Sequence, residues 1–254
     1  MTGTPVPIRD AATVVLLRDG AAGVEAWLLT RVRQMVFAPG MTVFPGGRVD
    51  EADASVPWAG RSVPDVAAQL GCDEVLARAL IGAAVRETFE ETGVLLTVPP
   101  ADLLGYRADV EAGRVGFAGL LRQHELALDA DAVRPWARWI TPEGEVRRYD
   151  TRFFVAALPT RGVAHDLTTE SSVAAWEPVR EAIAANARGE RRMLPPTIVT
   201  LRSIATHATV ADVLAAAADR DLNPVAPILV RGPDGVSIEL PDGSTVPLPG
   251  RTTA

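Results

Sequence analysis

Three glutamates are spaced so that one helix would carry all of their carboxylates on the same side. Glu87, Glu90 and Glu91 stand at positions i, i+3 and i+4, a spacing that brings Cβ atoms to about 5–6 Å from one another on a helix. Carboxylates this close repel each other unless a cation lies between them. Hard oxygen ligands on a rigid element suit magnesium or manganese. A solvated acidic helix face is the alternative, and the triplet alone leaves both interpretations open.

A helix over residues 74–92 is expected to carry these glutamates. Asp73 is a suitable N-cap, and Gly93 stands where a glycine would end the helix. Arg86 lies one turn before Glu90, so its guanidinium can hold a carboxylate in one rotamer. The apolar residues of the opposite face would anchor the helix in a core, and they are Ile81, Val85 and Phe89.

A glycine turn upstream, Phe44-Pro45-Gly46-Gly47, adds a second half to this pattern. Together the two segments resemble the signature of the Nudix hydrolase superfamily: Gly, five residues, Glu, seven residues, then Arg-Glu-aliphatic-x-Glu-Glu-x-Gly-aliphatic. The second half is present as Arg86 to Val94, with Thr88 in place of the aliphatic residue. In the first half, Asp53 stands where the family has glutamate.

The two halves lie further apart here than in the common pattern. Thirty-two residues separate Asp53 from Arg86, where the pattern has seven, so the motif carries an insertion over about residues 54–78. A loop can bulge out at this point at modest entropic cost. The resemblance implies an α+β fold, the Nudix α/β/α sandwich with a mixed sheet, over residues 9–190. Residues 191–249 would form a C-terminal helical and β-meander extension.

The resemblance also implies roles for the residues of the motif. Glu87, Glu90 and Glu91 would bind Mg²⁺ or Mn²⁺ together with the backbone carbonyl of Gly46, and Arg86 would orient the acidic cluster. Gly47, which lets the backbone approach phosphates closely, and Asp53 are candidates for substrate binding.

The chemistry expected of such a site is hydrolysis of a diphosphate. Bound metal ions neutralise the phosphate charge, lower the pKa of a bound water and stabilise the leaving phosphate. A carboxylate near that water can take its proton. Many Nudix enzymes use an acid outside the motif for this step, and Glu170 is our candidate, with an ordinary exposed loop glutamate as the alternative.

Residues around the glycine turn narrow the resemblance to acyl-coenzyme A diphosphatases with a long insertion in the motif. Leu28 to Arg31, Gly40 to Gly47 and Leu194-Pro195-Pro196-Thr197 carry this likeness. The substrate would then be coenzyme A or an acyl ester of it, and the products 3′,5′-ADP and a 4′-phosphopantetheine. Arg31 and Arg33 would bind phosphates through forked hydrogen bonds, unless they are ordinary surface-strand arginines.

Two other functions stay open at this point. One is a Nudix pyrophosphatase for another nucleoside diphosphate derivative, such as NADH, ADP-ribose or a dinucleotide polyphosphate. The other is a catalytically silent Nudix-fold ligand sensor. Asp53, which departs from the pattern, favours the sensor, whereas the retained Arg86 and the three glutamates favour an enzyme.

The remaining elements are expected to surround this helix. Residues 11–18 and 24–31 read as a hairpin. Two Pro-Asp-Gly turns predict a β-meander over 226–248. Helices are also expected over 178–189, 195–206 and 209–220. The extension would cap the main domain or form the interface of a homodimer.

Composition limits the class of partner. With 254 residues, 48% of them hydrophobic, the chain can bury one large core. A net charge of −7 disfavours a general nucleic-acid binder, so a small nucleotide-like molecule is the expected partner. The sequence has no apolar run of about 18 residues, so no membrane partner is expected. A single cysteine, Cys72, and an N-terminus without an apolar signal stretch lead us to expect a cytoplasmic protein.

Overall fold

A mixed β-sheet forms the centre of the molecule. The computed structural model describes residues 6–32, 39–167, 171–232, 235–240 and 243–248. In these residues the main sheet has the order β10-β2-β1-β9-β8, with β3 beside β2 and β4 beside β1. β1 and β9 run parallel and the other pairs are antiparallel, which confirms the predicted mixed sheet. The strands of this sheet are β1 Ile8–Gly20, β2 Gly23–Arg31, β3 Thr42–Val43, β4 Gly46–Arg48, β8 Arg134–Ile140, β9 Arg148–Ala157 and β10 Ser171–Pro178.

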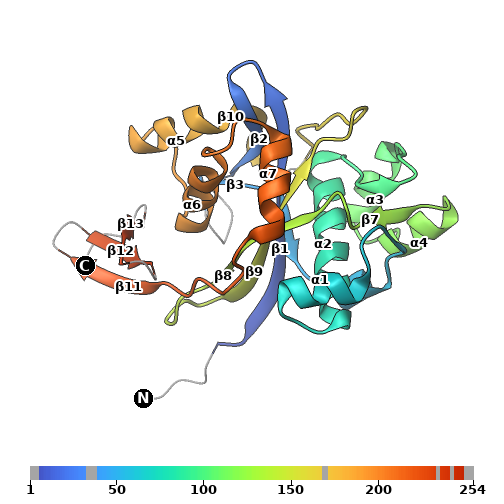
Figure 1. Ribbon diagram of the computed structural model, residues 1–254, viewed down its shortest axis with the longest axis horizontal. Helices are drawn as coiled ribbons and strands as arrows, with labels where there is room; N and C mark the ends of the chain where they lie inside the picture. Colours follow the sequence, from blue (N-terminus) through green and yellow to red (C-terminus); the bar gives the residue numbers. More distant parts are fainter. Residues whose placement is uncertain (1–5, 33–38, 168–170, 233–234, 241–242, 249–254) are drawn as a thin grey trace.

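Successive side chains of β1 enter two different hydrophobic cores. Val14 and Leu16 pack with α1 (Val63–Leu70) and α2 (Glu74–Thr92). Val15 and Leu17 pack in the second core, which includes residues of α5 (Val179–Ala187), α6 (Pro195–Ile204) and α7 (Val210–Ala216). Figure 1 shows α1 and α2 on one side of the sheet and α5 and α6 on the other. The predicted α/β/α sandwich is therefore confirmed, and α6 and α7 help to complete its second layer.

The predicted hairpin and meander are both present. β1 and β2 pair up to Gly20 and Gly23 at the turn. The meander consists of β11 (Ile228–Gly232), β12 (Gly235–Glu239) and β13 (Thr245–Pro247). It lies at the lower left of Figure 1, beyond the end of β8. The helix expected over 209–220 is shorter: α7 ends at Ala216 and tightens into the 3-10 turn η3 (Ala217–Asp219).

The insertion in the motif folds into defined elements. It begins in the 3-10 helix η1 (Glu51–Ser55), continues through β5 (Trp58–Ala59) and α1, and ends as the first turns of α2. Arg61 ties it to the rest of the molecule by donating to the backbone carbonyls of Ala130 and Val133. A small sheet joins β5 to β7 (Ala127–Asp129) and β6 (Thr97–Val98), and the intervening helices are η2 (Leu104–Tyr106), α3 (Arg107–Glu111) and α4 (Phe117–Gln123).

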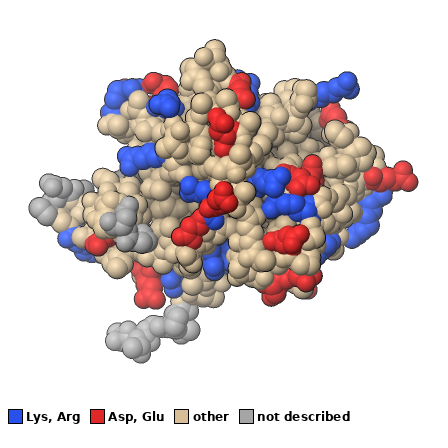
Figure 2. All heavy atoms as spheres, viewed as in Figure 1, with Lys and Arg blue, Asp and Glu red and all other residues tan. Residues whose placement is uncertain are grey.

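The surface carries charges of both signs. On the face drawn in Figure 2, arginines and acidic residues alternate over short distances. Within the described residues, no helix combines the length and the apolar character needed to cross a bilayer.

Candidate active site

Helix α2 positions the acidic residues, and it begins and ends where its capping residues predict. The Asp73 carboxylate accepts from the backbone N–H of Leu76 at 2.8 Å, and Gly93 ends the helix in the left-handed region at φ 75°. Ile81, Val85 and Phe89 are completely buried, as predicted. Because this face is held by the core, the side chains on the other face project from a rigid element.

Arg86 binds three acidic side chains at once. Its Nε and Nη2 donate to the two carboxylate oxygens of Asp53 at 2.8 and 3.0 Å, a bidentate fork. Its Nη1 donates to Glu87 at 2.8 Å and to Glu90 at 3.2 Å. Nη2 also donates to the backbone carbonyl of Arg48 at 3.0 Å. One guanidinium therefore links the insertion, the glycine turn and the acidic face of α2.

The acidic cluster is buried, and this changes its protonation. Burial, strengthened by the charge of Glu90, raises the pKa of Glu87 to about 7, although Arg86 opposes the shift. Burial likewise raises the pKa of Glu90. For Arg86, burial acts to lower the pKa, but the hydrogen bond to Asp53 and the negative charges of Glu87, Asp53 and Glu90 raise it above its ordinary value. The site is therefore a place where negative charge is crowded and incompletely compensated.

The glycine turn lies directly against these carboxylates. The backbone N–H of Gly46 donates to Glu91 at 3.0 Å. A Cβ added to Gly47 would lie 2.4 Å from a carboxylate oxygen of Glu87. Glycine at position 47 therefore leaves the space that Glu87 occupies.

A second close approach holds the insertion against α2. Asp53 is 2% exposed, and its carboxylate also accepts from the backbone N–H of Asp50 at 2.8 Å. A Cβ on Gly82 would lie 2.2 Å from the Asp53 carbonyl oxygen. Only a glycine lets η1 pack this closely on the helix, and this packing brings Asp53 within reach of Arg86.

A large cavity of about 1000 Å³ opens beside the acidic cluster. Glu87, Glu90 and Glu91 line it, together with Gly46, Gly47 and Arg31 among the predicted residues. The Leu194 to Thr197 segment, at the start of α6, lines it as well. The size lies at the upper end of the range usual for small-molecule sites. The structure thus brings the motif, one predicted arginine and the Leu-Pro-Pro-Thr segment to one space.

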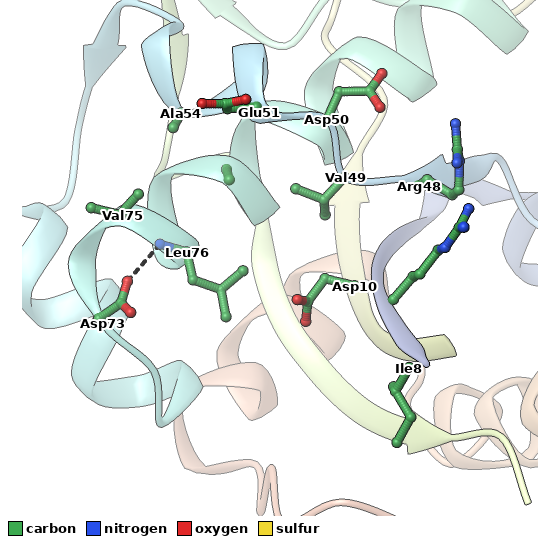
Figure 3. Close-up of a pocket in the computed structure, with 12 residues that line it drawn as sticks. Ile8, Asp10, Arg48, Val49, Asp50, Glu51, Ala54, Asp73, Val75 and Leu76 are labelled. Atoms are coloured by element: carbon green, nitrogen blue, oxygen red, sulfur yellow. Dashed lines mark hydrogen bonds between the residues drawn. The ribbon is translucent and has the colours of Figure 1, made fainter. Parts of the chain in front are cut away.

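A smaller cavity of about 480 Å³ lies on the insertion side of the glycine turn. Figure 3 shows it between the start of β1 at Ile8, the η1 region at Glu51 and the start of α2, where the Asp73–Leu76 capping bond is drawn. Arg48 lines both cavities. The motif glutamates line only the larger cavity, so we place the candidate active site there.

One predicted site residue lies away from the cavity, and two others fall outside the described residues. Asp53 was predicted to bind substrate, but its carboxylate is buried against Arg86 and does not line the large cavity. Arg33 and Glu170 lie outside the described residues. Thr88, the departure from the aliphatic position of the motif, is fully buried and donates its hydroxyl to the Ala84 carbonyl at 2.8 Å, so the polar group is satisfied within the helix.

Glu111 is an acidic residue of the site that the sequence interpretation missed. It lines the large cavity from α3 and forms an ion pair with Arg107 at 3.0 Å. Arg107 also donates to the backbone carbonyl of Glu90, so the pair is attached to α2. The i, i+4 spacing of Arg107 and Glu111 was a weak signal, because such pairs are common on exposed helix faces.

The donor set suits a hard divalent cation. As the side chains stand, the described residues do not bring three acidic, imidazole or thiol groups together as a ready cation site. Arg86 lies against Glu87 and Glu90, and Glu91 accepts from Gly46. Yet all three glutamates line one cavity, and the burial that raises the pKa of Glu87 and Glu90 is a cost that a cation would offset. Carboxylate oxygens are also the ligands that hard divalent ions prefer, so the residues fit such a metal.

The sandwich and this glutamate helix over a glycine turn define a hydrolase of the Nudix class. The chain belongs to the Nudix hydrolase family, because the family model described as the NUDT19 Nudix domain matches residues 72–204, just over half of the chain. The match begins beyond the glycine turn and Asp53, so those residues rest on the geometry described above. The chain is thus an enzyme of a family whose members generally use divalent metal ions.

Particular relatives share more of the chain. The acyl-coenzyme A diphosphatase NUDT19 of Gallus gallus is 29% identical, over 94% of this chain and 80% of its own length. The protein of the same name from Homo sapiens is 28% identical, over 76% of this chain and 63% of its own length. Among solved structures, a NUDIX hydrolase from Alicyclobacillus acidocaldarius superposes with a TM-score of 0.69 and 28% identity, covering 83% of this chain and 96% of that one.

Proposed function

We propose that this enzyme hydrolyses the diphosphate linkage of coenzyme A and of its acyl esters, giving 3′,5′-ADP and a 4′-phosphopantetheine or its acyl ester. The observation that carries the proposal is the large cavity, which joins the motif glutamates to Arg31 and to the Leu194–Thr197 segment. The vertebrate relatives that match most of the chain bear the name acyl-coenzyme A diphosphatase, which supports the same substrate class.

Glu87, Glu90 and Glu91, with the carbonyl of Gly46, would hold the divalent cation, for which we propose Mg²⁺ or Mn²⁺. When bound, the cation neutralises the diphosphate and acidifies a water molecule. Arg86 keeps Glu87 and Glu90 in place through Nη1. We assign Asp53 to positioning Arg86 rather than to contact with substrate, since its carboxylate is buried in that fork.

The reaction also needs a base and a group that binds phosphate. A water oxygen forms a bond to one phosphorus, the bridging P–O bond breaks, and the proton of the water passes to a carboxylate. Glu111 lies on the cavity wall and is a candidate for that carboxylate beside Glu170. Arg31 on the same wall is our candidate for binding a phosphate.

Product analysis tests this proposal. The protein would be incubated with Mg²⁺ or Mn²⁺, or with a chelator, and with coenzyme A, acetyl-coenzyme A, a long-chain acyl-coenzyme A, NADH, ADP-ribose or diadenosine polyphosphate. We expect metal-dependent release of 3′,5′-ADP from the coenzyme A compounds. Cleavage of only another member of the panel would keep the hydrolase and discard the coenzyme A assignment.

A further inference from the structure

The large cavity has two ends of opposite character. One end carries the motif glutamates and the glycine turn. The other end is largely apolar. It is lined by Trp139, Ile140, Val146, Leu229, Ile238 and Leu248, with the charged Glu145 and Arg147 on either side of Val146. Three of the apolar residues come from the C-terminal meander and three from β8 and the loop before β9. A diphosphate would occupy only the first end of the cavity. The second end can therefore bind a different part of the ligand.

The strand register places the two ends far apart. A row of partners crosses the sheet from Arg48 through Ala11, Thr151 and Trp139 to Val225, just before the meander. This row has four strand-to-strand steps, which amounts to about 19 Å at about 4.8 Å per step. A ligand whose diphosphate lies at the glycine turn therefore reaches the meander only through a long arm.

Hydroxyl side chains line the cavity between the two ends. Tyr149 and Thr151 belong to β9, which lies between β1 and β8, and Thr141 follows the end of β8. Tyr149 and Thr151 therefore offer hydrogen-bonding groups along the middle of the path. A polar arm with amide groups followed by an apolar tail matches this sequence of surfaces, and an acylated 4′-phosphopantetheine has that order of groups.

The meander presents one apolar face to the cavity. Leu229 of β11 pairs directly with Ile238 of β12, and both line the cavity. The neighbouring residue, Ile228, pairs with Glu239 and is 67% exposed. Alternation along the strand thus separates a residue that faces the cavity from one that faces solvent.

We propose that this apolar end binds the acyl chain of an acyl-coenzyme A, and that Leu229, Ile238 and Val146 set the preference for long chains over free coenzyme A. The inference rests on the proposed function, because it takes the diphosphate of coenzyme A to lie at the motif. Apolar area removed from water by the chain would stabilise the complex with each added methylene.

The test places a negative charge on the wall of the apolar end of the cavity. Leu229→Asp and Val146→Asp would each be compared with wild type on coenzyme A, octanoyl-coenzyme A and dodecanoyl-coenzyme A. We expect the ratio of kcat/KM for dodecanoyl-coenzyme A to that for coenzyme A to fall about tenfold, mainly through KM, because a charge disfavours contact with an alkyl chain. Val146 is 88% exposed, so its substitution tests the inference even if Leu229→Asp does not fold.

Matched controls place the same charge outside the cavity. Ile228→Asp, on the solvent side of the same strand, and Val163→Asp, at a site 61% exposed, are expected to keep the wild-type ratio. An unchanged ratio in both wall variants, or an equal change in Ile228→Asp, would overturn the acyl-chain assignment while coenzyme A hydrolysis stands. A wild-type protein that cleaves no coenzyme A compound would overturn the proposed function and this inference together.

Discussion

The two ends of the active-site cavity are built in different ways. The acidic end rests mainly on one helix, where Arg86, Glu87, Glu90 and Glu91 lie within six consecutive positions and the guanidinium of Arg86 is forked onto a buried aspartate. The apolar end is assembled from β8, the loop before β9 and the meander, segments separated by about eighty residues of chain. The first end depends on charges in a fixed geometry, and the second depends mainly on apolar area.

This difference indicates which substitutions should affect catalysis and which should affect substrate preference. Repulsive carboxylates must be held by specific partners, so small chemical changes at the acidic end should affect every substrate alike. Apolar contact is non-directional and shared among many residues, so changes at the other end should alter the choice among substrates and leave the chemistry in place.

The largest effect is expected from the carboxylates themselves. Glu90→Gln and Glu91→Gln should each lower turnover of every substrate by about two orders of magnitude or more, because each removes a charge that a catalytic cation needs. Steady-state kinetics would measure this, and circular dichroism would check the fold. Glu74→Gln, an exposed change in the first turn of the same helix, is the control. Wild-type turnover with unchanged metal binding in either variant would refute the site assignment.

Removal of the buried partner of Arg86 should mainly reduce stability. Asp53→Asn leaves a mostly buried guanidinium without its forked carboxylate, and such a loss costs about 3 kcal/mol of unfolding free energy. Urea denaturation would measure it. Asp131→Asn removes a carboxylate that is half exposed and 3.8 Å from Arg61, so it should cost about 1 kcal/mol or less. Equal costs for the two variants would argue against a positioning role for Asp53.

Alanine substitutions at two glycines should separate an effect on activity from an effect on stability. The atoms nearest to a methyl group at Gly47 belong to the end of the Glu87 side chain, which can rotate away, so Gly47→Ala should lower turnover about tenfold with little loss of stability. A methyl at Gly82 meets the backbone of Asp53, which cannot move easily, so Gly82→Ala should cost about 1–3 kcal/mol. Kinetics and thermal melts of both variants would show the contrast, and the reverse pattern would contradict it.

The smallest effect is expected at Thr88, one of the two residues that depart from the family pattern. Thr88→Val restores an aliphatic side chain in the motif. The Ala84 carbonyl that accepts the Thr88 hydroxyl keeps its place in the helix, so the unfolding free energy should change by about 1 kcal/mol or less. Chemical denaturation would detect a larger cost, which would mean that the hydroxyl supports the site in another way.

Local sequence determined the acidic end almost completely. The limits of α2 followed from Asp73 and Gly93, and the side on which its glutamates lie followed from Ile81, Val85 and Phe89. Helix caps and helical periodicity act over a few residues, so the sequence displays them directly. The hairpin and the meander were predictable for the same reason, because their turn residues are adjacent in the chain.

Only the tertiary structure decided what lies around that helix. Asp53 pairs with Arg86 across thirty-two residues because Gly82 lets η1 approach α2, and no local pattern shows that the carboxylate is buried. Glu111 and Leu229 looked like ordinary helix and strand residues until the sheet register brought β8 and the meander to the same cavity as α2. Contacts between distant segments depend on how whole elements pack, and that packing is a property of the complete fold rather than of any short stretch of sequence.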